Sequence, residues 1–312
     1  MNQFLTEVTK DLSGTPKTLN SKYFYDENGD KLFQEIMNCP EYYPTNCEKE
    51  IFSSRTKDLA ITLKNGFQTF DLVEMGAGDA TKSSYLLKEL MGMNADFTYM
   101  PIDISSTMVA HLEQSLPEQI PGLKVKGLNG EYFEMLEKAN EISSNRKVVL
   151  MLGGNLGNET PENALEFCRK IRATLQQGDV VLLGFDLKKN PKTILAAYND
   201  AAGFTRDFNL NLLHRINNEL SGNFDVSQFE HYPTYDPATG ACKSYLISKI
   251  DQEVVISNCV FQFAANEFIY MEISQKYTVE ETEDMARLSG FKAVGHFFDR
   301  KKWFVDTVWQ CV

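Results

Sequence analysis

The stretch Leu72-Val73-Glu74-Met75-Gly76-Ala77-Gly78-Asp79-Ala80-Thr81-Lys82 decides the fold of this chain. An apolar run reaches an acidic residue, two glycines follow, and residues 83–90 carry leucines at helical spacing. This order predicts a strand, a glycine-rich loop and a helix, an arrangement that can hold a nucleotide-like ligand. Glycine suits such a loop because its torsions penalise side chains and a ligand must approach the main chain closely. A structural turn without a ligand is the alternative interpretation.

Two positions narrow the choice of ligand. The dinucleotide fingerprint G-x-G-x-x-G has a third glycine where this chain has Thr81, which disfavours an NAD-dependent oxidoreductase. Residues 97–104 predict a second strand that carries Asp103 near its end. A carboxylate there can accept hydrogen bonds from both ribose hydroxyls. Gly76, Gly78 and Asp103 therefore suit the adenosine of S-adenosylmethionine at least as well as NAD.

Length, charge and hydropathy limit the class of protein. The 312 residues exceed the roughly 250–300 at which single cores stop growing, so more than one structural unit is expected. The net charge of -12 argues against a nucleic-acid partner, because phosphate binding relies on clusters of Lys and Arg. No segment approaches the roughly 20 apolar residues of a membrane helix, and the first residues lack a basic region followed by an apolar one. We expect a cytoplasmic protein that acts on a small molecule.

The six cysteines and four histidines are dispersed along the chain. The cysteines form no C-x-x-C pair, and the histidine spacings do not suggest metal ligation. Neither a zinc site nor a disulfide framework is predicted, and no metal is expected. Free thiols in a reducing compartment are the preferred interpretation.

Strands and helices are predicted to alternate from residue 71 to about 187. The expected strands are 71–76, 98–104, 123–128, 148–153 and 179–185, and a helix is expected over 161–175. Such alternation predicts a parallel sheet with helices on both faces and ligands at the carboxyl ends of its strands. Asn158 follows one of these strands, and its amide can point into the cleft or cap the helix that begins near Pro161.

The pattern changes after residue 187. Helical runs over 191–200 and 208–220 precede alternating segments over 242–250, 253–263 and 268–277, which predict antiparallel strands. A helix over 279–290 and a hairpin of strands 293–298 and 303–310 end the chain, as in the seven-stranded methyltransferase sheet. We expect one domain of residues 52–188 and 277–312, and a second α+β lobe of residues 1–51 and 189–276 over the cleft.

Several stretches together resemble the histidine-specific Nα-methyltransferase family of ergothioneine biosynthesis, whose members convert L-histidine to its trimethyl betaine. The matching stretches follow the family's order and cover nearly the whole chain: Lys22 to Asp26, Pro40 to Thr45, Leu72 to Lys82, Pro101 to Ile104, Leu156 to Asn158, Ala197 to Gly203, and Glu272 to Ser274. Pro40-Glu41-Tyr42-Tyr43-Pro44-Thr45 and Tyr198-Asn199-Asp200-Ala201-Ala202-Gly203 are far more specific than a glycine loop. The resemblance implies a class I, Rossmann-like α/β fold.

The resemblance also implies the cofactor and its residues. S-adenosylmethionine would be bound by Tyr25, Gly76, Lys82, Asp103, Glu131 and Tyr132. Where the family usually has Asp-Phe, this chain has Glu131-Tyr132, which keeps a carboxylate for the adenine amino group and a stacking aromatic ring. A monomer is expected.

For the amino-acid substrate, the resemblance implies a pocket of Tyr42, Asn158 and Tyr198, with Glu272 and Ser274 holding the imidazole. Asn158 and Tyr198 would bind the carboxylate. Residues two apart on a strand point to one face, and a carboxylate with a hydroxyl suits the two ring nitrogens of imidazole. A methionine that lines the family's pocket falls at Ser244 here, which leaves room for another amino acid.

We therefore expect an N-methyltransferase that methylates the α-amine of L-histidine up to trimethylhistidine. Since the sequence offers no dedicated base, we hypothesise that Tyr42 or a water molecule orients the amine and leads its proton away. An N-methyltransferase of another amino acid or aromatic amine, such as a tryptophan derivative, is the nearest alternative. Glu272 argues against it, because an indole offers a single N–H donor. A noncatalytic amino-acid-binding protein would not need Gly76, Gly78 and Asp103.

Overall fold

The computed structural model describes residues 2–67 and 69–312. Met1 and Gln68, which the expected domain ranges include, lie outside the described residues. The chain divides into a first unit, Met1–Tyr43 with Lys189–Gln275, and a second unit, Pro44–Lys188 with Lys276–Val312. The first division follows Tyr43 rather than residue 51, because nearly all of helix α3 (Tyr43–Ser54) belongs to the second unit.

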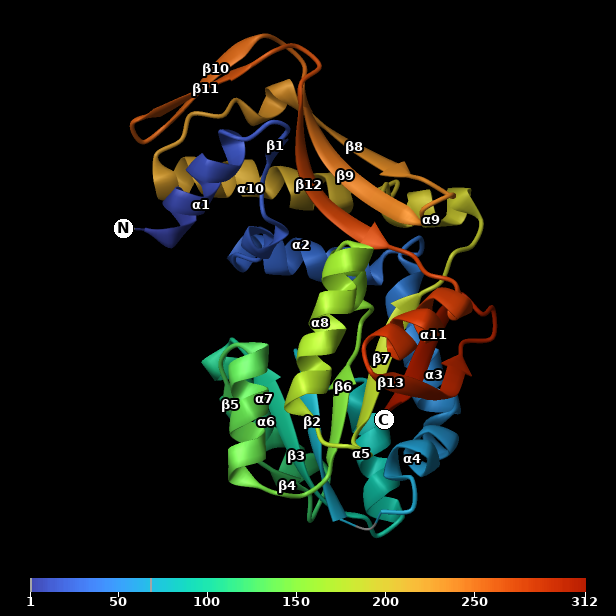
Figure 1. The fold of residues 1–312 in the computed structure, drawn as a ribbon. Helices are drawn as coiled ribbons and strands as arrows, with labels where there is room; N and C mark the ends of the chain where they lie inside the picture. The colour runs from blue at the N-terminus through green and yellow to red at the C-terminus, as the bar shows by residue number, and fades with distance from the viewer. Residues whose placement is uncertain (1, 68) are drawn as a thin grey trace. The chain divides into compact units, whose positions relative to one another are not determined.

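The second unit is built on an eight-stranded sheet in the order β13-β14-β7-β6-β2-β3-β4, with β5 also paired to β3 (Figure 1). Its strands are β2 (Thr69–Met75), β3 (Asp96–Asp103), β4 (Lys124–Val125), β5 (Leu128–Asn129), β6 (Lys147–Met151), β7 (Val180–Asp186), β13 (Phe291–Phe298) and β14 (Phe304–Cys311). The strands from β2 to β7 pair in parallel, whereas β14 runs antiparallel to both β7 and β13. The predicted parallel sheet with a closing hairpin is confirmed.

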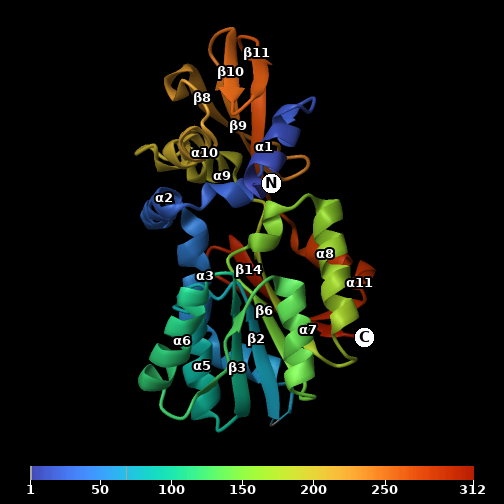
Figure 2. The same ribbon diagram turned by 90° about the vertical axis from the view of Figure 1, so that its left-hand side faces the viewer.

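Helices cover both faces of this sheet, as predicted (Figure 2). On one face lie α5 (Ser83–Gly92) and α6 (Ser106–Gln119), and on the other lie α7 (Tyr132–Ile142), α8 (Pro161–Thr174) and α11 (Val279–Leu288). Helix α4 (Thr56–Lys64) packs against α5. Val73, Val149 and Leu182, from three neighbouring strands, are fully buried. Continuous apolar strands are expected where a parallel sheet is covered on both sides.

The prediction of one continuous strand over 123–128 is wrong. The chain forms two short strands, β4 and β5, which both pair with β3 and are interrupted at Gly127. The Gly127 N–H donates to Oε1 of Glu113 on α6 at 2.7 Å. This interruption gives the sheet eight strands where seven were expected.

The structure also decides what caps α8. Thr160 is the N-cap, and its hydroxyl oxygen accepts a hydrogen bond from the Asn163 N–H at 3.3 Å. Asn158 instead closes a short 3-10 helix, η2 (Asn155–Asn158), and is exposed. The capping interpretation of Asn158 is therefore wrong, because Pro161 takes the first helical position and the cap falls directly before it.

The first unit combines helices with strands that are antiparallel except for the parallel pair β1 and β12. Its helices are α1 (Gln3–Leu12), η1 (Ser21–Phe24), α2 (Glu27–Asn38), α9 (Pro191–Ala197), α10 (Phe204–Leu220) and η3 (Val226–Gln228). A four-stranded sheet has the order β1-β12-β9-β8, formed by β1 (Lys17–Thr18), β8 (Phe229–Tyr235), β9 (Ala241–Ser248) and β12 (Phe268–Gln275). The segments predicted as antiparallel strands over 242–250 and 268–277 form β9 and β12, which are antiparallel to each other, whereas β8 was not predicted.

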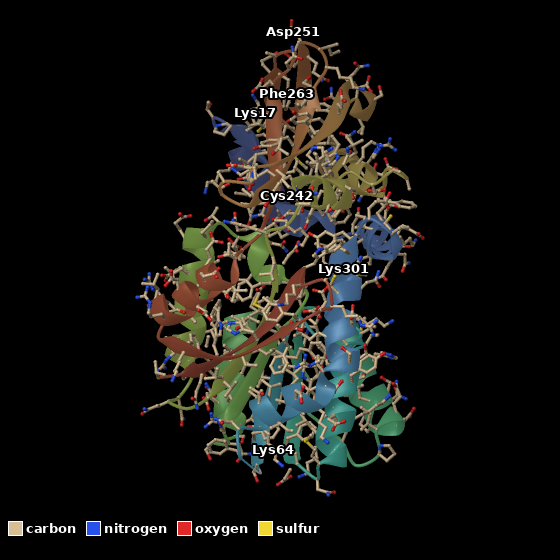
Figure 3. All side chains as sticks on the ribbon, turned by 90° about the vertical axis from the view of Figure 1, so that its right-hand side faces the viewer. Lys17, Lys64, Cys242, Asp251, Phe263 and Lys301 are labelled. Carbon is tan, nitrogen blue, oxygen red and sulfur yellow. The ribbon has the colours of Figure 1, made fainter. Side chains whose placement is uncertain are left out.

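The segment predicted over 253–263 is a hairpin rather than one strand. β10 (Gln252–Ile256) and β11 (Cys259–Phe263) pair with each other, and the turn between them includes Ser257 at φ +52°. At the end of β11, the Phe263 ring lies 4.9 Å from the Lys17 ammonium (Figure 3). In the described ranges, no helix combines the length and the apolar composition needed to cross a bilayer.

Candidate active site

Backbone N–H groups of the glycine loop donate hydrogen bonds to the end of β3. Gly76 and Gly78 have positive φ values of 74° and 52°, as the predicted turn requires. The Gly76 N–H donates to the Ile102 carbonyl at 2.9 Å, and the Gly78 N–H donates to Oδ2 of Asp103 at 3.3 Å. Because β2 and β3 are parallel neighbours, the predicted loop and carboxylate meet at one edge of the sheet.

Tyr132 and Glu131 complete this cluster at the start of α7. A Cβ at Gly76 would lie 2.7 Å from the Tyr132 hydroxyl oxygen, so space as well as torsion requires glycine there. Burial raises the pKa of Tyr132, and the charges of Asp103 and Glu131 raise it further. The structure therefore brings together four residues predicted for the cofactor: Gly76, Asp103, Glu131 and Tyr132.

Lys82 lies at the N-cap of α5 and contacts Glu48 of α3. Burial by itself lowers the pKa of Lys82, but Glu48, Asp306 and Glu74 outweigh that effect and raise it. The ammonium is therefore charged at neutral pH. Together these residues fit S-adenosylmethionine: a carboxylate for ribose hydroxyls, an aromatic ring, a cation for an anionic group, and a glycine where a Cβ would fill the space.

Tyr25 is the exception among the predicted cofactor residues. It belongs to the first unit, whereas the others belong to the second. Its side chain is 47% exposed, and its ring contacts Phe33 and Phe208 at centroid distances of 5.6 and 5.5 Å. Within its unit, Tyr25 is thus part of an aromatic cluster.

A β-bulge orients the predicted imidazole residues. On β12 and β9, Glu272 pairs with Ser244 and Ser274 pairs with Cys242, but the register shifts between Tyr270 and Glu272. Met271 is the extra residue of this bulge. Since side chains alternate along a strand, the bulge turns Glu272 and Ser274 to the face of Ser244. The prediction that Glu272 and Ser274 share a face agrees with this register.

Tyrosine and asparagine side chains surround this pair. The hydroxyls of Tyr198 and Ser274 share a hydrogen bond of 2.6 Å, and the rings of Tyr198 and Tyr42 meet edge to face at 6.3 Å. Nδ2 of Asn209, on α10, lies 3.4 Å from Oε1 of Glu272. The first unit therefore brings together Tyr42, Tyr198, Glu272 and Ser274, while Asn158 belongs to the second unit.

Sequence reasoning missed two site residues. Asn209 is fully buried and precedes Leu213 and Ile216 by four and seven residues on the apolar face of α10. That position is a usable signal, because asparagine is unfavourable inside helices and among apolar side chains. Glu48 is 1% exposed, yet nothing in its local sequence distinguishes it from its exposed neighbour Lys49.

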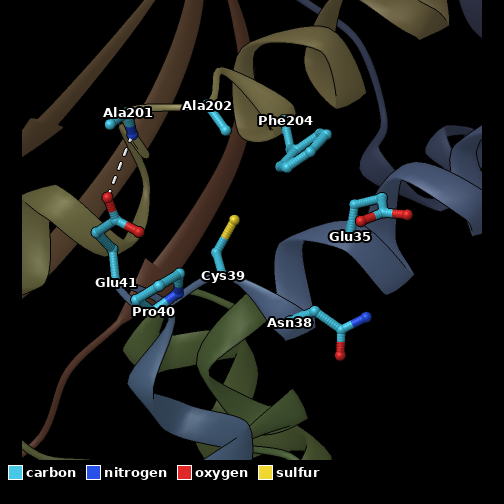
Figure 4. Close-up of a pocket in the computed structure, with 8 residues that line it drawn as sticks. All are labelled: Glu35, Asn38, Cys39, Pro40, Glu41, Ala201, Ala202 and Phe204. Carbon is cyan, nitrogen blue, oxygen red and sulfur yellow. Dashed lines mark hydrogen bonds between the residues drawn. The ribbon is translucent and has the colours of Figure 1, made fainter.

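A separate surface hollow of about 280 Å³ lies in the first unit (Figure 4). Phe204 and Cys39 line it together with Glu35 and Glu41, and Oε1 of Glu41 accepts a hydrogen bond from the Ala201 N–H at 3.4 Å. Of its described lining residues, none is a predicted site residue. Across residues 2–67 and 69–312, no three His, Cys, Asp or Glu side chains gather in a way that could hold a metal ion.

The fold and the glycine loop with Asp103 define a class I, Rossmann-like α/β methyltransferase. Residues 4–311 match the family described as histidine-specific, S-adenosylmethionine-dependent methyltransferases. The chain belongs to this family, as the sequence resemblance predicted, and it uses S-adenosylmethionine as the cofactor.

Three known proteins illustrate the similarity. The chain is 34% identical to the histidine N-alpha-methyltransferase of Mycolicibacterium smegmatis, over 88% of this chain and 84% of that protein. It is 31% identical to the enzyme of the same name from Mycobacterium tuberculosis, over 96% and 90% of the two chains. The ergothioneine biosynthesis protein 1 of Schizosaccharomyces pombe is 28% identical over 89% of this chain, which covers 37% of that longer protein.

Proposed function

We propose that this protein methylates the α-amine of L-histidine, up to trimethylhistidine, as a step of ergothioneine biosynthesis. The observation that carries the proposal is the bulge at Met271, which turns Glu272 and Ser274 to the face of Ser244. Membership of the histidine-specific methyltransferase family supports the same substrate.

The pair Glu272 and Ser274 suits a neutral imidazole. One ring nitrogen of imidazole donates and the other accepts, so a carboxylate and a hydroxyl complement both. Asn209 donates toward Glu272, and a carboxylate has two oxygens that can each accept hydrogen bonds. In this proposal Glu272 accepts from the imidazole N–H, and the Ser274 hydroxyl donates to the other nitrogen.

Tyr198 and Asn158 are proposed to bind the substrate carboxylate. A tyrosine hydroxyl and an asparagine amide both donate hydrogen bonds, which a carboxylate accepts. The hydrogen bond between the Tyr198 and Ser274 hydroxyls links the proposed carboxylate contact to the imidazole contact. This hydrogen bond would therefore fix the spacing between the residue that binds the substrate carboxylate and the residue that binds the imidazole.

For the cofactor, we propose that Asp103 binds the ribose hydroxyls, Glu131 the adenine amino group and Lys82 an anionic group, with Tyr132 and Tyr25 against the rings. S-adenosylmethionine supplies an activated methyl group when bound, so the protein's own task is to position the amine and exclude water. The amine must lose a proton before it can attack. We assign its orientation, and the path of that proton, to the Tyr42 hydroxyl.

Further parts of the proposal concern the protein's context. We propose that the second unit carries the cofactor and the first unit most of the amino-acid contacts, following the residues assigned to each. A monomeric, cytoplasmic enzyme without a nucleic-acid partner is consistent with the net charge of -12 and with cysteines that form no C-x-x-C pair.

The second candidate is an N-methyltransferase of another amino acid. Ser244 favours it, because this small residue lies opposite Glu272 where a methionine is expected in the family. Mass spectrometry of purified protein with S-adenosylmethionine and L-histidine tests the main proposal, and stepwise gains of up to three methyl groups are expected. Unchanged histidine would reject it. A Tyr42→Phe variant with full activity would remove Tyr42 from the proton path.

A further inference from the structure

Glu48 contacts two different segments of the candidate site within the second unit. One oxygen, Oε2, contacts the ammonium of Lys82, and the other, Oε1, accepts a hydrogen bond from the Gly153 N–H at 2.7 Å. Lys82 ends the glycine loop that follows β2. Gly153 follows β6 and opens the turn that leads to Asn158. A single buried carboxylate thus joins the proposed cofactor lysine to the segment that carries a proposed substrate residue.

The sheet leaves space for this carboxylate. Gly184 on β7 has no side chain, and a Cβ there would lie 2.7 Å from Oε1 of Glu48. Glu48 is 1% exposed, so its position is fixed by the surrounding protein rather than by solvent. A charge buried to this degree needs partners, which Lys82 and the Gly153 amide provide.

Asp306 is a second carboxyl group beside this contact. It pairs with Gly184 across β14 and β7, is fully buried, and its two oxygens have no hydrogen-bond partner among the described residues. Burial raises the pKa of Asp306 well above its usual range, and the charge of Glu48 adds to that effect. Of these two carboxyl groups, Glu48 is the one that forms the ion pair with Lys82.

We propose that Glu48 is a positioning residue, which holds Lys82 for the cofactor through its charge and holds the turn before Asn158 through the Gly153 N–H. The inference rests on the proposed function, since that function assigns Lys82 to the cofactor and Asn158 to the substrate. The inference adds that the Glu48 side chain positions both Lys82 and the turn before Asn158. Glu48 acts through these residues and need not touch either ligand.

The two contacts can be separated by substitution. In Glu48→Gln the amide oxygen can still accept from the Gly153 N–H, but the charge that faces Lys82 is lost. In Glu48→Ala both contacts are lost. Glu50→Gln is the matched control, because Glu50 lies on the same helix and its carboxylate pairs instead with Arg300 at 3.0 Å near the surface.

Titration calorimetry with S-adenosylhomocysteine tests the first contact without relying on turnover. We expect Glu48→Gln to weaken this binding about tenfold, which corresponds to the loss of one charge-assisted contact. Its KM for the amino acid should stay within about twofold of the unsubstituted protein, whereas Glu48→Ala should raise that KM as well. Binding by Glu50→Gln should be unchanged.

A double-substitution cycle shows whether Glu48 acts through Lys82. In a Lys82→Met background, Glu48→Gln should have no further effect on S-adenosylhomocysteine binding. Equal effects with and without Lys82, or unaltered binding in Glu48→Gln, would overturn the inference. If Glu48→Gln does not fold, Glu48→Asp takes its place, because its shorter side chain keeps the charge but cannot reach both Lys82 and Gly153. Unaltered binding of S-adenosylhomocysteine by Glu48→Asp would also overturn the inference. Failure of the unsubstituted protein to bind S-adenosylhomocysteine would instead reject the proposed function and the inference together.

Discussion

Ser244 lies directly opposite Glu272 on the antiparallel strands β9 and β12, and both side chains point to the same face. Ser244 is 1% exposed. The position at which the family resemblance implies a methionine is thus the cross-strand neighbour of the carboxylate proposed to bind the imidazole. Substrate choice should depend on these two residues together.

Glu272→Gln should raise the KM for L-histidine about tenfold. The substitution replaces a charged hydrogen-bond acceptor with a neutral amide, and such a bond contributes roughly 1.5 kcal/mol more when charged. Steady-state kinetics measure the effect, and calorimetry with S-adenosylhomocysteine should show unaltered cofactor binding. Glu253→Gln, an exposed substitution on β10, is the control. An unchanged KM in Glu272→Gln would remove Glu272 from the imidazole contact.

Deletion of Met271 should keep Glu272 opposite Ser244, because the Tyr270–Tyr245 pair would then be followed directly by the Glu272–Ser244 pair. Histidine affinity should therefore be retained, whereas loss of the buried methionine should lower the free energy of unfolding by roughly 2–5 kcal/mol, measured by urea denaturation. Met271→Leu is the control, because it keeps the residue count and nearly the same volume, at a cost below about 1.5 kcal/mol. Loss of histidine affinity in a folded deletion variant would contradict this register.

The glycine loop contains one strained alanine. Ala80 has φ +53°, a conformation that costs a residue with a Cβ roughly 1–2 kcal/mol. Ala80→Gly should therefore raise the free energy of unfolding by about 0.5–1 kcal/mol, after the greater entropy of glycine in the unfolded chain is subtracted. Urea denaturation measures this change. Ala77→Gly, in the same loop without a positive φ, should lower stability, and an equal loss in both variants would refute strain at Ala80.

Glu74 should make stability depend on pH. Burial raises its pKa to about 7 from an ordinary 4.5, with a smaller contribution from Glu48. Between these values the folded protein binds more protons at Glu74 than the unfolded chain does. Its contribution to the free energy of unfolding is therefore present below pH 4.5 and is lost as the pH rises through about 7.

Glu74→Gln removes this titration. Relative to the unsubstituted protein, the variant should gain up to about 3 kcal/mol between pH 4.5 and 8, measured by denaturation at a series of pH values. Ser83 and Tyr99, whose hydroxyls donate to Glu74, can still bond to the amide. Glu134→Gln, an exposed change on α7, should leave the pH profile unaltered. A profile for Glu74→Gln that parallels the original would contradict the raised pKa of Glu74.

Most of the sheet was predictable because its signals are local. The stretch from Leu72 to Lys82 places apolar residues, glycines and leucines in the order that β2, the loop and α5 require, and Asp103 follows the same logic on β3. The break between β4 and β5 depends on Glu113 of α6, which the sequence of residues 123–128 does not contain.

The site was predicted only in part, for a related reason. Family motifs located Tyr42, Glu272 and Ser274, but strand alternation alone did not reveal the bulge at Met271, since a bulge is defined by its partner strand. Glu48 and Asn209 make contacts that form only after helices pack on strands. These contacts could be found from the folded structure, not from residue type and spacing.

The most direct test of the central claim is a competition assay. Purified protein is incubated with S-adenosylmethionine and an equimolar mixture of the twenty amino acids, and the products are resolved by mass spectrometry. The proposed function predicts that histidine alone gains mass, in steps up to three methyl groups. Methylation of another amino acid while histidine stays unmodified would contradict the claim, and the pocket would then have to be assigned anew around Ser244.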